Sequence, residues 1–270
     1  MSMNTQDPNQ FESSVSIQTF LLFLFATVIG LLVAVLLLPI FLPNMAFSLS
    51  GDAPKAYWYL SRGTAFVSLS LLWVSMALGL GITNKMARLW PGMPATFAIH
   101  EYVSLLGLAF ALFHALIILG DHYINFTLLQ LIIPFSTVDY KPFWVGIGQI
   151  GFYVWLIVAA SFYIRPTIGQ KFWRLLHYAS FGMYFLGIFH GIFSGTDTSM
   201  SWAQNYYWFS AGSLIFLFFV RIVGDARRAR ASRDHSKKST LSDRIRLRER
   251  CLQVPFSERH PRSVCAIRGT

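Results

Sequence analysis

The sequence predicts an all-α membrane protein, a bundle of six transmembrane helices, and two observations carry this prediction. Of the 270 residues, 54% are hydrophobic and only 13% are charged, whereas a soluble globular domain carries about 25% charged residues. In addition, 13 of the 22 Lys and Arg residues lie in residues 225–270. The remainder of the chain is nearly neutral, so the overall basic charge does not indicate a nucleic-acid-binding protein.

Six uncharged or nearly uncharged runs have the length that a membrane-spanning helix needs, which is about 20 residues. In lipid each backbone amide must be bonded within its own segment, so such runs are expected to be helices. In chain order they are residues 18–42, 58–82, 97–120, 143–164, 173–194 and 206–224.

The organisation that follows is a short N-terminal segment (1–17), the transmembrane domain (18–224) and a basic tail (225–270). The tail is rich in Arg, Lys and Ser and cannot bury a core, so we expect it to be disordered or to lie on anionic headgroups. Residues 122–142 connect the third and fourth spans, and their apolar run, residues 126–134, is too short to cross. We expect an interfacial or a re-entrant segment there, capping the outer face.

The orientation follows from the Lys and Arg residues next to the spans, which collect on the cytoplasmic side. They predict a plasma (inner) membrane protein with both termini in the cytoplasm. The residues on which this rests are Lys85, Arg88, Arg165, Lys171, Arg174 and Arg221.

Four histidines fall inside two of the expected spans. His100 and His114 are 14 residues apart in the third, and His177 and His190 are 13 apart in the fifth. Both spans run from inside to outside, and at 1.5 Å per residue the separations are about 21 and about 19.5 Å, so the histidines form an upper and a lower level. Any one of them alone is also explained by an interhelical hydrogen bond.

Two facing imidazoles are suited to fill both axial positions of a haem iron. Zinc needs four ligands around one point, which two levels do not provide. An offset of 13 residues turns a helical residue about 140° away from its starting face, so the fifth helix must bend, unwind or present its two sites at different angles. Gly107, Gly187 and Gly191 fit close approach of a macrocycle and equally fit helix packing.

Together these residues resemble the ferric reductase-like transmembrane domain shared by ferric reductases, NADPH oxidases and related bacterial haem proteins. The resemblance covers residues 57–197, including the unequal histidine spacing. The matching segments are Trp58-Tyr-Leu-Ser-Arg-Gly-Thr64, His100-x13-His114, Pro134-Phe-Ser, Trp173-Arg-Leu-Leu-His177 and His177-x12-His190-Gly191.

The resemblance implies two b-type haems between the third and fifth helices, His100 and His177 holding the inner one and His114 and His190 the outer one. Electrons would pass from a cytoplasmic-side or membrane donor to an extracytoplasmic acceptor. Arg62 is expected either to contact an outer-haem propionate or an anionic acceptor, or to reach the surface. Arg174 is expected either to contact an inner-haem propionate or to be one of the basic residues that flank a span on the cytoplasmic side.

The chain departs from full-length reductases, which continue into a flavin and nicotinamide module. Only 46 residues follow Gly224, and they contain no Gly-rich dinucleotide fingerprint. We therefore expect a separate electron donor: a flavoprotein, a quinol or a bound flavin. Three functions stay open: a ferric reductase-like oxidoreductase, a haem-bearing membrane subunit that supplies a partner periplasmic reductase, and a transporter or structural bundle without redox chemistry.

Overall fold

The computed structural model describes residues 16–42, 47, 55–83, 92–122 and 124–253. The regular structure in these ranges is entirely helical, which confirms the all-α prediction for this part of the chain. The chain divides into two units, Met1–Phe218 and Phe219–Thr270. The basic loop with Lys85 and Arg88, most of the N-terminal segment and the last 17 residues lie outside the described ranges.

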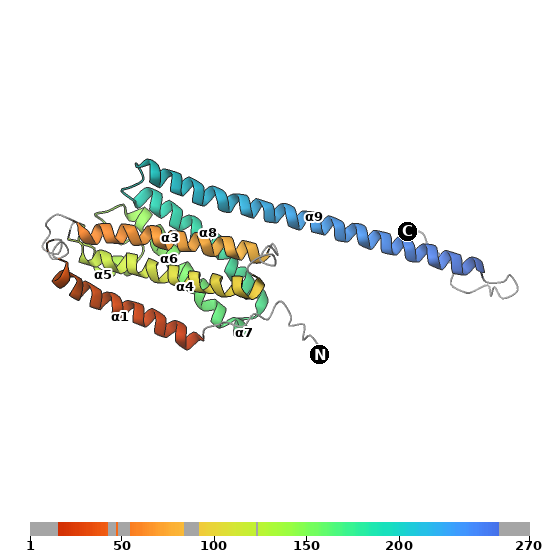
Figure 1. Cartoon of the computed structure of the whole chain (residues 1–270), viewed down its shortest axis with the longest axis horizontal. Coiled ribbons are helices and arrows are strands. Elements are labelled where there is room, and N and C mark those ends of the chain that lie inside the picture. Colours follow the sequence, from red (N-terminus) through yellow and green to blue (C-terminus); the bar gives the residue numbers. More distant parts are fainter. Residues whose placement is uncertain (1–15, 43–46, 48–54, 84–91, 123, 254–270) are drawn as a thin grey trace. The chain divides into compact units, whose positions relative to one another are not determined.

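Within the described ranges, five helices are long and apolar enough to cross a membrane: α1, α3, α4 together with the short helix η2, α6 and α9. They coincide with five of the six predicted spans. The sixth, α8, lies where the fifth span is predicted, but its histidines, lysine, arginine and glutamine make it more polar than the others. The elements are α1 (Ile17–Phe41), α3 (Ala56–Thr83), α4 (Met93–Ile117), η2 (Ile118–Gly120), α5 (Leu128–Ile132), α6 (Pro142–Tyr163), α7 (Arg165–Ile168), α8 (Gln170–Ser194) and α9 (Ser201–Gln253) (Figure 1).

The helix boundaries follow from local chemistry. Prolines occupy the first turn of both α4 and α6, where the missing N–H costs nothing. Gly92 and Gly169 have φ values of 108° and 83° at the starts of α4 and α8, a backbone conformation that glycine adopts without steric cost. Gly169 therefore separates α7 from α8 and lets the chain reverse between α6 and α8.

In the first unit, α3 packs mainly against α4, and α6 mainly against α8. The core between them is formed by large buried side chains such as Leu108, Trp155 and Tyr184. The beginning of α9 completes this core through Ala203, Tyr207 and Leu214. The helix pairs α3/α4 and α6/α8 are thus the two halves that position the candidate site.

In the second unit, residues 219–253 continue α9 as a helix. For the tail, which begins at residue 225, we expected either disorder or a position on anionic headgroups, and a helix differs from the first of these. The sequence there is rich in Arg, which favours helix, and Arg221 and Asp225 form an i,i+4 pair at 3.8 Å. Nearly all described side chains of this stretch are exposed, so the helix buries no core of its own.

Candidate functional site

Four histidines from α4 and α8 form two facing pairs. The ring centroids of His100 and His177 lie 6.2 Å apart, with an interplanar angle of 69°. Those of His114 and His190 lie 6.1 Å apart, with an angle of 71°. The structure thus brings together the residues that their spacing along the sequence places at matching levels.

The two pairs occupy the space where the two helix pairs meet. Because α4 packs chiefly on α3, and α8 chiefly on α6, the histidines of α4 and α8 face each other across that space. α8 is continuous from Gln170 to Ser194, so local unwinding does not provide the rotation that the 13-residue offset requires. The two pairs nevertheless have nearly the same distance and ring angle.

Three of the four imidazoles are held by backbone carbonyl groups through Nδ1. The distances are 2.9 Å from His100 to the carbonyl oxygen of Ser75, 2.8 Å from His114 to that of Ser61, and 2.9 Å from His190 to that of Trp144. A carbonyl oxygen only accepts hydrogen bonds, so Nδ1 carries the proton. Nε2 then keeps its lone pair, which is the tautomer of a histidine that ligates a metal through Nε2.

His177 is held differently. Within the described part of the chain its Nδ1 is buried without a hydrogen-bond partner. Instead, the ring stacks on Trp173, one turn earlier on α8, at a centroid distance of 5.1 Å and an angle of 30°. Its orientation is therefore set by packing, and its tautomer is not fixed by a neighbour.

The carbonyl partners on α3 belong to a seven-residue repeat of serines. Ser61, Ser68 and Ser75 are all buried. Ser68 donates its hydroxyl hydrogen to the carbonyl oxygen of Gly107 at 2.9 Å, midway between the two histidine contacts. Antiparallel α3 and α4 therefore meet in a register in which serines at every seventh residue oppose His114, Gly107 and His100.

The hydroxyl groups of this repeat add a second contact to each histidine of α4. Ser61 Oγ lies 2.9 Å from Nδ1 of His114, and Ser75 Oγ lies 3.2 Å from Nδ1 of His100. These serines were not predicted from the sequence. They are seven residues apart, and Gly107 is likewise seven residues from His100 and from His114. This common period of seven residues is the pattern from which the contact could have been predicted.

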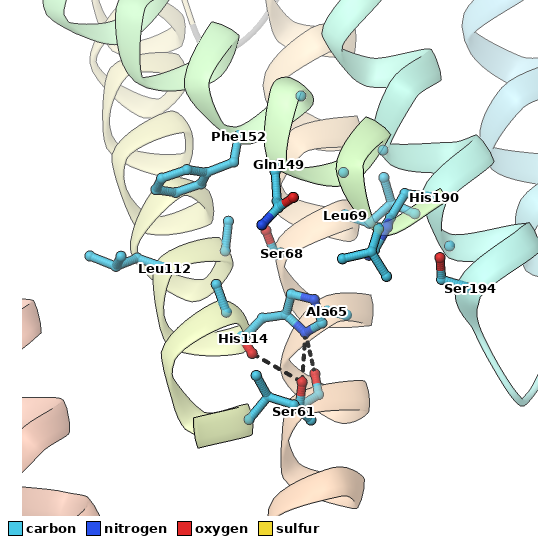
Figure 2. Close-up of a pocket in the computed structure, with 18 of the residues that line it drawn as sticks. Ser61, Ala65, Ser68, Leu69, Leu112, His114, Gln149, Phe152, His190 and Ser194 are labelled. Carbon is cyan, nitrogen blue, oxygen red and sulfur yellow. Dashed lines mark hydrogen bonds between the residues drawn. The ribbon is translucent and has the colours of Figure 1, made fainter. Parts of the chain in front are cut away.

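The pair His114–His190 borders a cavity of about 490 Å³, a volume in the range of small-molecule and cofactor sites. Figure 2 shows His114, bonded to Ser61, and His190 beside this cavity. Apolar side chains dominate the lining, among them Leu69, Leu112 and Phe152. The site is thus a largely apolar pocket whose lining includes the two imidazoles.

Two glycines lie directly against the histidines. A Cβ atom at Gly148 on α6 would lie 2.4 Å from Nδ1 of His190, and one at Gly79 on α3 would lie 3.4 Å from Cε1 of His100. Gly148 is therefore required for His190 to reach the carbonyl of Trp144. Sequence analysis did not single it out, because nothing in residues 143–164 shows which face meets α8.

Of the three glycines named from the sequence, one lies at a helix contact and two line the cavity. A Cβ at Gly107 would lie 2.8 Å from the Trp155 ring, which makes Gly107 a helix-packing residue. Gly187 and Gly191 both line the cavity, and a Cβ at Gly191 would lie 2.8 Å from the hydroxyl of Tyr207.

The two predicted arginines differ in environment. Arg62 lines the cavity. It forms a bidentate ion pair with Asp197, in which Nε of Arg62 donates to Oδ2 of Asp197 at 2.7 Å. Asp197 is buried and was not indicated by the sequence pattern. Arg174 lies one turn before His177 with an exposed side chain.

Among the residues that the structure describes, no group of three or more His, Cys, Asp or Glu side chains is placed to hold a metal ion. Each histidine pair offers two protein ligands. Comparison of the chain with family models, with curated proteins and with solved structures finds no match.

Proposed function

We propose that this chain is a six-helix membrane protein that binds two b-type haems, one between His100 and His177 and one between His114 and His190. Its proposed function is to carry electrons across the membrane to an extracytoplasmic acceptor, as in the ferric reductase-like family that it resembles. The observation that carries the proposal is the geometry of the two histidine pairs.

The distance between the rings in each pair suits ligation of one iron from both sides. An imidazole nitrogen ligates a first-row transition metal at about 2 Å, and the ring centroid lies about 1 Å further out, so two axial imidazoles have centroids about 6 Å apart. The pairs in this structure have 6.2 and 6.1 Å. If the two rings of each pair only packed against each other, nothing would require the same centroid distance in both pairs.

The hydrogen bonds around the histidines support the same assignment. The carbonyl groups of Ser61, Ser75 and Trp144 orient three rings and leave Nε2 available, as second-shell partners of metal-ligating histidines do. When bound, a haem with two histidine ligands supplies a reversible one-electron couple and leaves no open position on the iron.

The sixth span and the orientation belong to this proposal. α8 has 25 residues, enough to cross about 30 Å of hydrocarbon, and its lower apolarity comes partly from the histidines themselves. The basic residues Arg165, Lys171 and Arg174 lie at its beginning and before it. On the basis of the positive-inside rule, we propose that the start of α8 and both termini lie on the cytoplasmic side of the inner membrane.

The proposed electron donor is the one expected from the sequence, a flavoprotein, a quinol or a bound flavin at the cytoplasmic side or in the membrane. The proposed acceptor is an extracytoplasmic acceptor or a reductase subunit. His114 and His190 both line the cavity, which supports an exchange of electrons at this pair. We therefore propose that electrons leave at the outer pair.

The test uses haem-loaded protein in proteoliposomes, with an impermeant reductant on one side and an impermeant ferric chelate on the other. We expect chelate reduction by the wild type and its loss in His100→Ala and in His114→Ala, since each interrupts one level. His122→Ala is the matched control, because His122 is exposed beyond η2. Equal rates in wild type and in both ligand variants would refute the proposed function.

A further inference from the structure

The short helix α5 exposes apolar side chains on one face. The exposed fractions are 56% for Leu128, 67% for Leu129, 53% for Ile132 and 48% for Ile133. Gln130 and Leu131, together with the edges of Leu128 and Ile132, line the cavity that contains His114 and His190. α5 therefore stands between this cavity and whatever surrounds the protein at that position.

Backbone groups at both ends of α5 form hydrogen bonds with side chains of the protein. Thr127 and Gln130 form a capping box at the first turn, with the backbone N–H of Thr127 donating to Oε1 of Gln130 at 2.9 Å. At the other end, Gln149 donates Nε2 hydrogens to the carbonyl oxygens of Gln130 and Leu131 at 2.7 and 2.8 Å. The hydroxyl of Tyr153 donates to the carbonyl oxygen of Ile132.

Pairing of the terminal carbonyl groups with side chains is needed in hydrocarbon but not in water. At an aqueous surface, the last carbonyl groups of a helix bond to water at no cost. In a bilayer, irregular or terminal backbone is tolerated only where protein groups satisfy it. Here, two side chains from α6 bind three carbonyl groups of a five-residue helix, and four apolar residues next to these carbonyl groups are exposed. This arrangement fits a bilayer environment.

The positions of Gln149 and Tyr153 give the depth of α5. α6 has 22 residues and is about 33 Å long, barely more than the hydrocarbon core of about 30 Å. Gln149 and Tyr153 lie about 10 and about 16 Å below its outer end, Pro142. Even if their side chains lean back one turn, or about 5 Å, the carbonyl groups that they hold lie inside the hydrocarbon.

The chain turns sharply on either side of α5. Among the described non-glycine residues, positive φ values occur at Asn125, Phe135 and Lys141, which flank the helix on both sides. Such conformations are costly and persist where surrounding contacts enforce them. Phe135 lies so close to α6 that a Cβ at Gly146 would be 2.2 Å from its ring. These reversals suit a segment that enters and leaves the membrane from one side.

We propose that residues 126–133 form a re-entrant segment in the outer half of the bilayer. Its outward face contacts lipid acyl chains, and its inward face is the wall that separates them from the histidine cavity. Gln149 and Tyr153 hold it at this depth. This requires α6 to cross the membrane but does not require haem.

The test is a spin-label depth measurement on the full chain in nanodiscs. The two native cysteines, Cys251 and Cys265, are first changed to Ser, and a single label is placed at Leu129. Reference labels are placed at Ile150 and Ile157, which are exposed on α6, and at Thr196, which is exposed beyond α8. Collision rates with oxygen, which concentrates in lipid, are compared with those of a water-soluble nickel chelate.

We expect the Leu129 label to match Ile150, with oxygen collisions dominant, and to differ from Thr196. Dominant nickel collisions at Leu129, with Ile150 and Ile157 still shielded, would overturn the proposal. Dominant nickel collisions at the α6 labels would instead show that α6 is not in the membrane, which contradicts the proposed function as well.

A second measurement tests the two side chains from α6. In the Gln149→Leu/Tyr153→Phe double variant, three carbonyl groups lose their donors, so the Leu129 label is expected to shift towards nickel accessibility. The Ile157 label should stay shielded, which shows that the bundle is intact. Tyr178→Phe is the control, because Tyr178 is exposed on α8. No shift in the double variant would refute the role of Gln149 and Tyr153.

Discussion

Nδ1 of His114 donates to the carbonyl oxygen of Ser61 at 2.8 Å, and the Ser61 hydroxyl lies 2.9 Å from the same nitrogen. The backbone of α3 therefore fixes the ring by a group that no side-chain substitution removes. The hydroxyl contributes a smaller second contact.

Ser61→Ala tests this division between backbone and side chain. When a ligating histidine loses its hydrogen-bond partner, the affinity of a metal site falls about 10- to 100-fold. Because the Ser61 carbonyl stays in this variant, we expect the affinity of the His114–His190 site for haem to fall about tenfold or less. Haem titration of the apoprotein measures it, with Ser70→Ala as a control away from the histidines. A complete loss of the outer haem would contradict the assignment of the main contact to the carbonyl.

Gly148→Ala is expected to have a larger effect at the same site. The added Cβ would lie 2.4 Å from Nδ1 of His190, so the ring must leave the carbonyl of Trp144. The predicted result is loss of the outer haem with the inner one retained, observed as half the wild-type haem content. Gly182→Ala is the matched control, because a Cβ there meets nothing within 4 Å. Full haem content in Gly148→Ala would refute the role of this glycine.

Gly107→Ala tests helix packing separately from ligand binding. Its Cβ would lie 2.8 Å from the Trp155 ring and 3.2 Å from Leu71 Cβ, and such overpacking costs about 1–3 kcal/mol. We expect a lower free energy of unfolding in detergent and an unchanged histidine environment. In Gly63→Ala, where a Cβ meets nothing within 4 Å, the free energy of unfolding should stay equal or rise by about 0.5–1 kcal/mol. Equal stability of the two variants would be evidence against the close packing.

The inner and outer sites should differ in haem affinity. Both histidines of the outer pair are held through Nδ1, whereas His177 in the inner pair relies on stacking with Trp173. An unanchored ligand lowers affinity by about tenfold or more. We therefore expect the outer site to fill first when haem is limiting, and spectra of His114→Ala and His177→Ala titrations assign the two phases. Filling of the inner site first would contradict this order.

The ion pair between Arg62 and Asp197 can be measured by a double-mutant cycle. Asp197→Asn leaves the guanidinium partly buried without its acid, and we expect a loss of about 2 kcal/mol in unfolding free energy. Arg62→Gln/Asp197→Asn should cost less than the sum of the single changes, because each single change already breaks the pair. Strict additivity would show that the two groups do not stabilise each other.

The sequence predicts the helices and the histidine levels because both depend on local spacing. Uncharged run length locates α1, α3, α4, α6 and α9, and the rise per residue places four histidines at two levels. The serine repeat at residues 61, 68 and 75 was equally visible, but a period of seven on one helix acquires meaning only when a partner helix shows the same period.

Other parts of the site depend on contacts between distant segments. Arg62 and Asp197 are 135 residues apart, and Gly148 meets His190 across two helices. No periodicity within one segment shows which faces of α6 and α8 meet. The helix at residues 225–253 was missed for a different reason: composition showed that it buries no core, but a solvated helix needs none when its residues favour helix by propensity.

The most direct test of the central claim is the haem content of the purified protein, measured with its reduced-minus-oxidised absorption spectrum. For the wild type we predict a b-type α-band with two haems per chain. We predict one haem per chain in each of the single variants His100→Ala, His114→Ala, His177→Ala and His190→Ala. A protein that binds no haem after reconstitution, or four variants that all keep two haems, would contradict it.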